Sequence, residues 1–443
     1  MTSLPQPRSA LARYRRAALA SAFLVVLASA DPPTSAQAQK PGQPATPASR
    51  AAAVLDPATD RLDYAFAEGL EFRLEADLPG ELQQVLLRYT IGQDAPRNRR
   101  VPEFRPGGRR LEARHEEDLV RGAIPPASLI RWWWTVTLTD GQVLETTPQE
   151  ARYMDERFAW QSLEDEDLRV WWYEAPRGFA QDIADQAEAA LDRLAPLIGS
   201  RPDRRVELVT YQSQADLRDA MFDRGEGYEE RLSTLGARVA PDILILDAGT
   251  GGPELEEVIA HELSHIVLHL HFEEAYLDAP LWLDEGLAMY VEGPLDGGEQ
   301  RSLDRALAAD QLMSVRSLTS FPGNPDQVEL AYAQSRDLVA FLIDTGGEER
   351  FRRLLAEVGR GEADIDAILR GIYGHDQLGL YQAWRAAKGL PPAATPQPGA
   401  PPRVLERPAP LGGGAGLPCA PALWLPLALV WAAGRRGRRG PRP

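Results

Sequence analysis

From about residue 60 to residue 155, apolar and polar residues alternate in short runs that are separated by turn residues. Such a period of two is typical of strands with one buried face. Strands are expected at residues 70–78, 83–91, 130–138 and 143–147. Thr139-Asp140-Gly141-Gln142 predicts the hairpin turn that joins the last two. We therefore predict an all-β sandwich domain over residues 59–155.

Three consecutive tryptophans lie in the strand at residues 130–138. Alternation puts Trp132 and Trp134 on one face of the sheet and Trp133 on the other. The run is compatible with carbohydrate binding, but at least one face is expected to be core, so we favour packing. The size of the domain and its strand pattern suggest a sandwich of immunoglobulin or fibronectin type III style.

The pattern becomes mixed over residues 156–390, which predicts an α+β domain. Strands are expected at residues 168–174, 205–211 and 242–246, and an amphipathic helix is expected at residues 178–198. Toward the C-terminal end the periodicity is helical, at residues 303–313, 329–344, 348–358 and 364–373. The domain is therefore expected to end in a helical subdomain.

One helix of this domain carries candidate metal chemistry. Gly252-Pro253 predicts its start, because proline is favoured at the first helical position. The segment His261-Glu262-Leu263-Ser264-His265 follows within it. Residues four apart differ by about 40° around a helix, so both imidazoles point from one face toward one ion. The glutamate between them reaches the water on that ion and takes its proton.

A catalytic zinc commonly has three protein ligands and one open position for water. Glu285 lies 20 positions after His265, in the segment Trp282-Leu283-Asp284-Glu285-Gly286-Leu287-Ala288, and Pro280 predicts the start of a second helix. The two motifs together resemble those of the gluzincin metallopeptidases, in particular the peptidase MA-like proteins related to the catalytic domain of family M1 aminopeptidases. The resemblance implies a thermolysin-like zincin domain with zinc held by His261, His265 and Glu285.

His271 is a competing third ligand, because it lies ten positions after His261, which is the metzincin spacing. Metzincins break the helix at a glycine, and no glycine lies between His265 and His271. If the helix continues, His271 lies about 120° round from His265 and cannot reach the same ion. His269 is two turns from His261, so we interpret both residues as structural or supporting.

Roles are also expected for three neighbouring residues, of which only that of Tyr332 is implied by the resemblance. Glu262 is expected to be the general base that delivers the proton to the leaving amine. Tyr332 is the candidate oxyanion donor, although a core tyrosine is nearly as compatible with its position. Asp284 is expected to orient a ligand histidine. No Gly-x-Met-x-Asn segment, which binds the free α-amino group in M1 aminopeptidases, precedes the helix, so endopeptidase and aminopeptidase specificities both stay open.

The formal charge of −17 conceals a segregation, because nine arginines lie in the two terminal segments and the rest of the chain is near −26. Such an acidic protein is a poor candidate for phosphate-backbone binding, so nucleic acid is not an expected partner; a peptide or protein substrate is. The single cysteine, Cys419, excludes a disulfide framework within the chain.

The termini predict export. A basic stretch, an apolar run and Ala28-Ser29-Ala30 predict a signal peptide and cleavage region over residues 1–38, with a retained anchor as the alternative. Residues 39–58 are Pro- and Ala-rich and predict a linker. Residues 391–416 predict a low-complexity stalk. Residues 417–443, apolar and then Arg-rich, predict a C-terminal membrane anchor or a sorting signal whose tail is removed, with the enzyme outside.

The combined prediction is an exported, surface-tethered zinc metallopeptidase with a β-sandwich ahead of its catalytic domain. Two alternatives stay open: a surface adhesion or binding protein that has the zincin fold and little activity, and a metzincin-like site that uses His271. The intact Glu262 argues against the first alternative, because a scaffold does not need a base beside the metal.

Overall fold

The protein is represented by a computed structural model. It describes residues 52–93, 97–221, 236–249, 253–272, 279–319 and 325–393. The predicted signal peptide, stalk and C-terminal anchor or sorting signal lie almost entirely outside these residues. None of the helices within the described ranges combines the length and the apolar character that crossing a bilayer requires.

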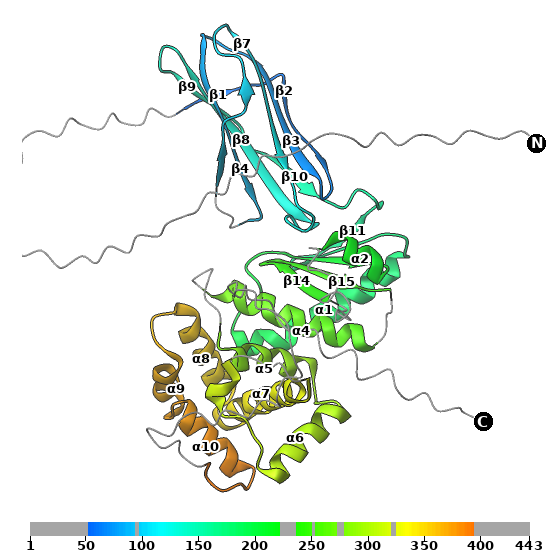
Figure 1. The fold of residues 1–443 in the computed structure, drawn as a ribbon, viewed down its shortest axis with the longest axis vertical. Coiled ribbons are helices and arrows are strands. Elements are labelled where there is room, and N and C mark those ends of the chain that lie inside the picture. Colours follow the sequence, from blue (N-terminus) through cyan, green and yellow to red (C-terminus); the bar gives the residue numbers. More distant parts are fainter. Residues whose placement is uncertain are drawn as a thin grey trace, which may run out of the picture. The chain divides into compact units, whose positions relative to one another are not determined.

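The N-terminal region consists of strands in two sheets, as predicted (Figure 1). One sheet has the order β1-β9-β8-β4-β5, with β10 also paired to β8; the other has the order β2-β3-β7-β6. The first sheet contains β1 (Ala53–Leu55), β4 (Leu82–Ile91), β5 (Asn98–Arg100), β8 (Ser128–Leu138), β9 (Val143–Thr146) and β10 (Gln149–Tyr153). The second contains β2 (Thr59–Ala65), β3 (Gly69–Asp77), β6 (Glu103–Phe104) and β7 (Arg110–Asp118).

The two sheets share one apolar core, to which alternate residues of the longer strands β3, β4, β7 and β8 contribute. Phe72 of β3 contacts the ring of Trp132 of β8 edge-on, with 6.1 Å between ring centroids. Trp132 and Trp134 are buried and both donate from Nε1 to Oδ1 of Asp60, at 2.7 and 2.9 Å. The prediction that at least one face of the tryptophan run is core is confirmed, and that face carries Trp132 and Trp134. Trp133 lies on the opposite face of the sheet, as the alternation requires.

The second region contains a five-stranded sheet in the order β11-β12-β13-β15-β14. Its strands are β11 (Gln161–Glu164), β12 (Leu168–Trp172), β13 (Val206–Tyr211), β14 (Gly236–Ala240) and β15 (Ile243–Asp247). The three central strands are parallel and the two edge strands are antiparallel to them. Every residue of β13 and β15 is buried, which explains why the apolar run Ile243–Leu246 of β15 is continuous rather than alternating.

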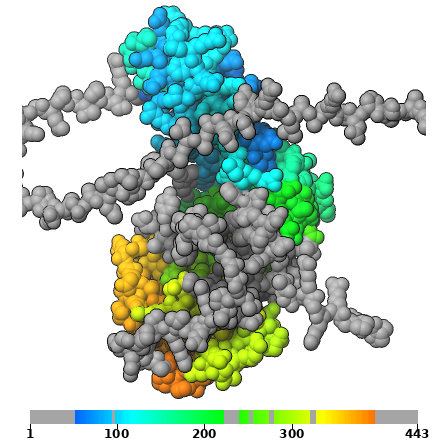
Figure 2. Space-filling model, viewed as in Figure 1, coloured from blue at the N-terminus to red at the C-terminus, as the bar shows by residue number. Residues whose placement is uncertain are grey.

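Helices make up most of the rest of this region. They are α1 (Arg177–Ile198), α2 (Gln214–Ala220), α4 (Pro253–His271), α5 (Leu281–Glu292), α6 (Gly297–Ala309), the 3₁₀ helix η1 (Val315–Thr319), α7 (Pro325–Gly346), α8 (Glu348–Arg360), α9 (Ile365–Tyr373) and α10 (Gln377–Ala387). Helices α1, α4 and α5 pack on one another through an apolar core that also includes the sheet. Helices α8 to α10 add side chains such as Phe351, Leu369 and Trp384 to the same core, and their exposed atoms are yellow-orange to orange in Figure 2.

The bounds of two predicted segments were wrong. The helix predicted at residues 303–313 is α6, which begins at Gly297 because Asp296 and Glu299 form a capping box. It ends before Asp310, whose φ of 52° leaves the helical region. The predicted linker 39–58 includes strand β1, which exists because it pairs in parallel with β9, a contact from a distant part of the chain.

Candidate metal centre

Helix α4 places two imidazoles side by side. Its apolar residues, among them Ile259, Leu263 and Ile266, are buried and fix one face of the helix in the core. His261 and His265 project from the helix four residues apart, and their ring centroids are 4.9 Å apart. They are 8% and 2% exposed, so both rings are withdrawn from bulk water. The predicted geometry, two imidazoles on one face of one helix, is present.

Helix α5 brings the carboxylate of Glu285 to the same point. It begins after Pro280 and continues through Trp282 and Leu283, which are fully buried. The Oε2 atom of Glu285 lies 3.4 Å from Nε2 of His261 and 3.6 Å from Nε2 of His265. The candidate ligand atoms of the three residues all lie within 4.8 Å of one another. Two segments of sequence therefore converge on one position.

Two further carboxylates lie behind the imidazoles. His265 donates from Nδ1 to Oδ1 of Asp284 at 2.7 Å, and His261 donates from Nδ1 to Oε1 of Glu292. In the neutral form of each ring, this bond selects the tautomer whose Nε2 carries a lone pair directed away from the carboxylate. The structure thus gives both imidazoles the same support, one from each end of α5.

Sequence reasoning named Asp284 and missed Glu292. A signal was present, because Glu292 follows Glu285 by seven residues and so lies within about 20° of it around a helix. A carboxylate at that spacing projects from the same face of α5 as the candidate ligand. Glu292 also closes the helix, and its side chain is only 12% exposed.

The charges of the centre perturb one another strongly. Burial lowers the pKa of His265, but the negative charges of Asp284 and Glu285 outweigh burial and raise it to about 10. Burial likewise lowers the pKa of His261, and Glu292 and Glu285 raise it well above its ordinary value. Burial raises the pKa of Glu285, but the two imidazoles lower it to about 2. The buried carboxylates therefore favour positive charge at this centre, from protonated imidazoles or from a bound cation.

This donor set fits a divalent metal ion. Nε2 of His261, Nε2 of His265 and Oε2 of Glu285 are buried, and none has a hydrogen-bond partner among the described residues. Buried polar atoms without a hydrogen bond are costly, and here three of them face one point. Two imidazole nitrogens and one carboxylate oxygen are ligands that zinc accepts in sites with an open fourth position.

Glycine at position 286 lets α5 approach α7 closely. A Cβ atom there would lie 2.5 Å from the backbone oxygen of Ser335 and 2.7 Å from Cγ2 of Val339, closer than atoms approach without displacement. The contact fixes the part of α5 from which Glu285 projects. Helix α7 therefore supports the third candidate ligand from behind.

Glu262 and Tyr332 are both buried near the centre. Glu262 lies between the two histidines on α4 and is 1% exposed. Tyr332 of α7 packs with Met289 of α5 and Val328. Burial raises the pKa of Tyr332, and the charges of Glu285 and Glu262 raise it further, so its hydroxyl keeps its proton. Tyr332 thus combines a core position with proximity to the candidate centre.

The other two histidines of α4 lie elsewhere. The helix continues without a break to His271, as expected from the absence of glycine. His269 donates from Nδ1 to the backbone carbonyl of His265 at 2.7 Å, and Nδ1 of His271 lies 3.2 Å from the hydroxyl of Ser200. Neither residue joins the group of three facing ligand atoms.

Comparison with known proteins gives one match to a family model and several to solved structures. Residues 186–388 match the peptidase MA superfamily. The chain is similar to the crystal structure of an M1 zinc metallopeptidase from Deinococcus radiodurans at 15% identity and a TM-score of 0.31, covering 74% of this chain and 92% of that one. A mutant of an M1 zinc metallopeptidase from the same organism, bound to a Tyr-Ser-Ala substrate, gives 13% identity and a TM-score of 0.34, with 74% and 91% covered.

No curated protein sequence matches this chain. The matched segment, residues 186–388, contains α4 with both histidines, α5 with Glu285, and the helices that follow to α10. The motif resemblance and the family model therefore agree over the same part of the chain. The segment that carries both motifs is therefore similar to the peptidase MA superfamily.

Proposed function

We propose that the protein is a zinc-dependent metallopeptidase with His261, His265 and Glu285 as the zinc ligands. The observation that carries the proposal is the convergence of three buried ligand atoms, without hydrogen-bond partners among the described residues, inside the segment that matches a peptidase family. Zinc accepts this combination of nitrogen and oxygen ligands in catalytic sites.

Zinc bound there would lower the pKa of a coordinated water toward neutrality and so supply the nucleophile. Asp284 and Glu292 would hold the two imidazoles in the tautomer and orientation that ligation needs. The close packing of Gly286 against α7 would hold the Glu285 carboxylate in place. These residues would not contact the reacting atoms; they would hold the zinc ligands in position before the substrate binds.

Glu262 would take a proton from the attacking water and later deliver it to the nitrogen of the leaving amine. Tyr332 would donate a hydrogen bond from its hydroxyl to the substrate carbonyl oxygen as negative charge develops there. The raised pKa of Tyr332 supports this role, because only the protonated hydroxyl can donate. The substrate would be a peptide or protein, with endopeptidase and aminopeptidase specificities both open.

We also keep three wider interpretations as proposals. The protein is exported by the signal at residues 1–38, and residues 417–443 either anchor it or are removed after sorting. The two-sheet N-terminal region is of immunoglobulin or fibronectin type III style. The helices after α5 form the subdomain on one side of the substrate cleft.

The test compares the native protein with Glu262→Gln. We expect the native protein to contain about one zinc per chain and to hydrolyse casein, and we expect Glu262→Gln to keep the zinc and lose hydrolysis by 10²-fold or more. Glu256→Gln, an exposed position on the same helix, is the matched control and should retain full activity. Equal hydrolysis by native protein and Glu262→Gln would refute the proposed mechanism.

Tyr332→Phe tests the oxyanion role separately. It keeps the ring in its apolar contacts and removes only the hydroxyl, so stability and zinc content should change little. We expect kcat to fall about 10²-fold with a small change in KM. A variant with native kcat would leave Tyr332 as a core residue only.

A further inference from the structure

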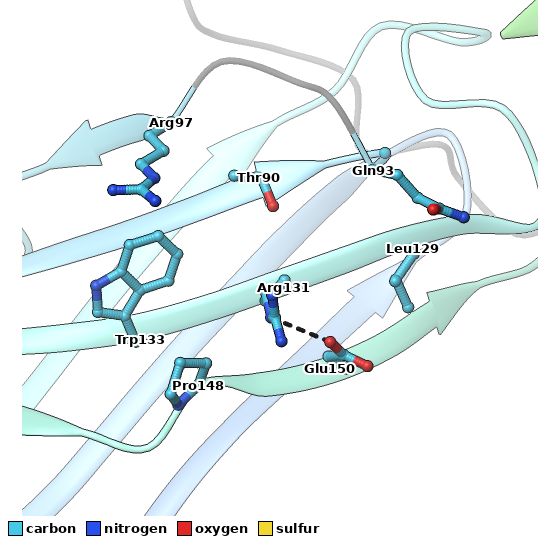
Figure 3. Close-up of a pocket in the computed structure, with 9 residues that line it drawn as sticks. Thr90, Gln93, Arg97, Leu129, Arg131, Trp133, Pro148 and Glu150 are labelled. Carbon is cyan, nitrogen blue, oxygen red and sulfur yellow. Dashed lines mark ion pairs between the residues drawn. The ribbon is translucent and has the colours of Figure 1, made fainter. Parts of the chain in front are cut away.

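The outer face of the larger N-terminal sheet contains a pocket of about 810 Å³ (Figure 3). Side chains from β4, β8 and β10 and from the chain just before β5 line it. Among them are Thr90, Gln93, Arg97, Arg131, Trp133 and Glu150. The volume is within the range of about 300–1,000 Å³ that small-molecule sites occupy. This pocket lies in the N-terminal two-sheet region, whereas the candidate metal centre lies on α4 and α5.

Trp133 gives the pocket an aromatic surface. Its neighbours in β8, Trp132 and Trp134, point into the core, so alternation forces Trp133 outward. The ring is only partly buried, and in Figure 3 it lies between Arg97 and Pro148. Cζ of Arg97 is 5.7 Å from the ring centroid, a cation–π arrangement that orients both groups. A tryptophan held on a sheet face presents a rigid flat surface at low entropic cost.

The polar residues around Trp133 carry an excess of positive charge. Arg88 lies opposite Trp133 in the register of β4 and β8, and Arg99 lies opposite Arg88 on β5. Among the residues that the structure describes, no carboxylate lies within ion-pair distance of Arg88, Arg97 or Arg99. Arg131 is paired with Glu150 at 3.0 Å, drawn as the dashed line in Figure 3. This face of the sheet is therefore positively charged, although the whole chain has a formal charge of −17.

We propose that this pocket binds an acidic saccharide, a sugar chain that carries carboxylate groups. The C–H face of a pyranose ring would stack on the part of the Trp133 indole that Arg97 leaves exposed, and Arg97 would bind a sugar carboxylate through its planar guanidinium. Thr90, Gln93 and Glu150 would exchange hydrogen bonds with ring hydroxyls. An acidic peptide would satisfy the arginines but has no rigid apolar ring face for the tryptophan.

The test measures binding of a uronic-acid oligosaccharide, such as hexagalacturonate, to the full chain by titration calorimetry. A neutral hexasaccharide such as maltohexaose and a poly-glutamate peptide of equal charge are the comparison ligands. We expect saturable binding of hexagalacturonate that weakens as salt increases, and binding of the other two at least tenfold weaker. Equal binding of poly-glutamate, or no binding of hexagalacturonate, overturns the proposal.

Two substitutions localise the site. Trp133→Ala and Arg97→Ala should each weaken hexagalacturonate binding by roughly tenfold. Arg61→Ala, an exposed arginine on the other sheet, is the matched control and should bind as the native chain does. Glu262→Gln should also bind normally, which separates this site from the proposed peptidase function. Undiminished binding by a folded Trp133→Ala and by Arg97→Ala would refute the assignment; the second variant decides if the first does not fold.

Discussion

Replacing Glu292 by glutamine tests whether the carboxylates behind the imidazoles contribute to metal binding. Glu292 accepts a hydrogen bond from Nδ1 of His261 and is largely buried. Glutamine keeps the length and an accepting oxygen, so the tautomer of His261 can be retained while the negative charge is lost. The substitution therefore isolates the electrostatic part of the support that Glu292 gives to a ligand.

The size of the effect follows from the position of Glu292. A carboxylate that supports a ligating histidine contributes about 10- to 100-fold in metal affinity. That factor corresponds to about 1.4–2.7 kcal/mol of binding free energy. We expect a value near the upper end, because the side chains of Glu292 and His261 are only 12% and 10% exposed and solvent screens them little.

The assay is competition for zinc between the protein and a fluorescent chelator at pH 7.5, with buffer and ionic strength held constant. Glu349→Gln, the same substitution at a side chain that is 76% exposed, is the control and should bind zinc as the native protein does. We expect Glu292→Gln to bind zinc 10- to 100-fold more weakly while its melting temperature without metal changes by a few degrees. Zinc affinity within twofold of native would refute the supporting role of Glu292.

Two further predictions concern packing and pH. Gly286→Ala inserts a methyl group 2.5 Å from the backbone oxygen of Ser335, so we expect the free energy of unfolding to fall by about 1–3 kcal/mol and zinc to bind more weakly. Denaturant titration measures the first effect and chelator competition the second. An unchanged denaturation midpoint would contradict the packing argument. In the N-terminal region, the hydrogen bond from Arg100 lowers the pKa of Glu117 from 4.5 to about 2, so its stabilisation is present above pH 4.5 and is lost as pH falls toward 2. Glu117→Gln should therefore cost on the order of 1–2 kcal/mol at pH 7 and little at pH 2, and an equal loss at both pH values would contradict this linkage.

The helices of the candidate centre could be predicted because local signals agree there. Pro253 and Pro280 precede helical periodicity, and the His-Glu-x-x-His spacing has meaning only on a helix. The approach of Glu285 to the two histidines was expected from the resemblance rather than from periodicity. That approach depends on the packing of α4, α5 and α7, which sequence spacing does not specify.

Several strands escaped prediction because they are stabilised by contacts distant in sequence. Strand β7, with the sequence RLEARHEED, has few apolar residues, and its place is set by pairing along the whole of β3. Strand β1 has three residues and depends on parallel pairing with β9. Glu292 was missed for a related reason, since its contact with His261 links two helices across 31 positions. In each case contacts with a segment distant in sequence, rather than the local pattern of apolar and polar residues, determine the structure.

The carboxylates of the centre show why such a site conflicts with stability. Glu262 and Glu285 are each 1% exposed, and Asp284 and Glu292 lie directly behind the imidazoles. Buried negative charges are costly unless cations offset them, and two imidazoles can supply at most two positive charges by taking up protons. The carboxylates of Asp284 and Glu285 raise the pKa of His265, because negative charges beside the ring favour its cationic form. A divalent ion on the Nε2 side would offset the same charge and leave both imidazoles neutral, as ligation requires. We therefore expect the stability of this site to depend on the ion that it is proposed to bind. Removing that ion by chelation should lower the melting temperature of the native protein more than that of Glu285→Gln.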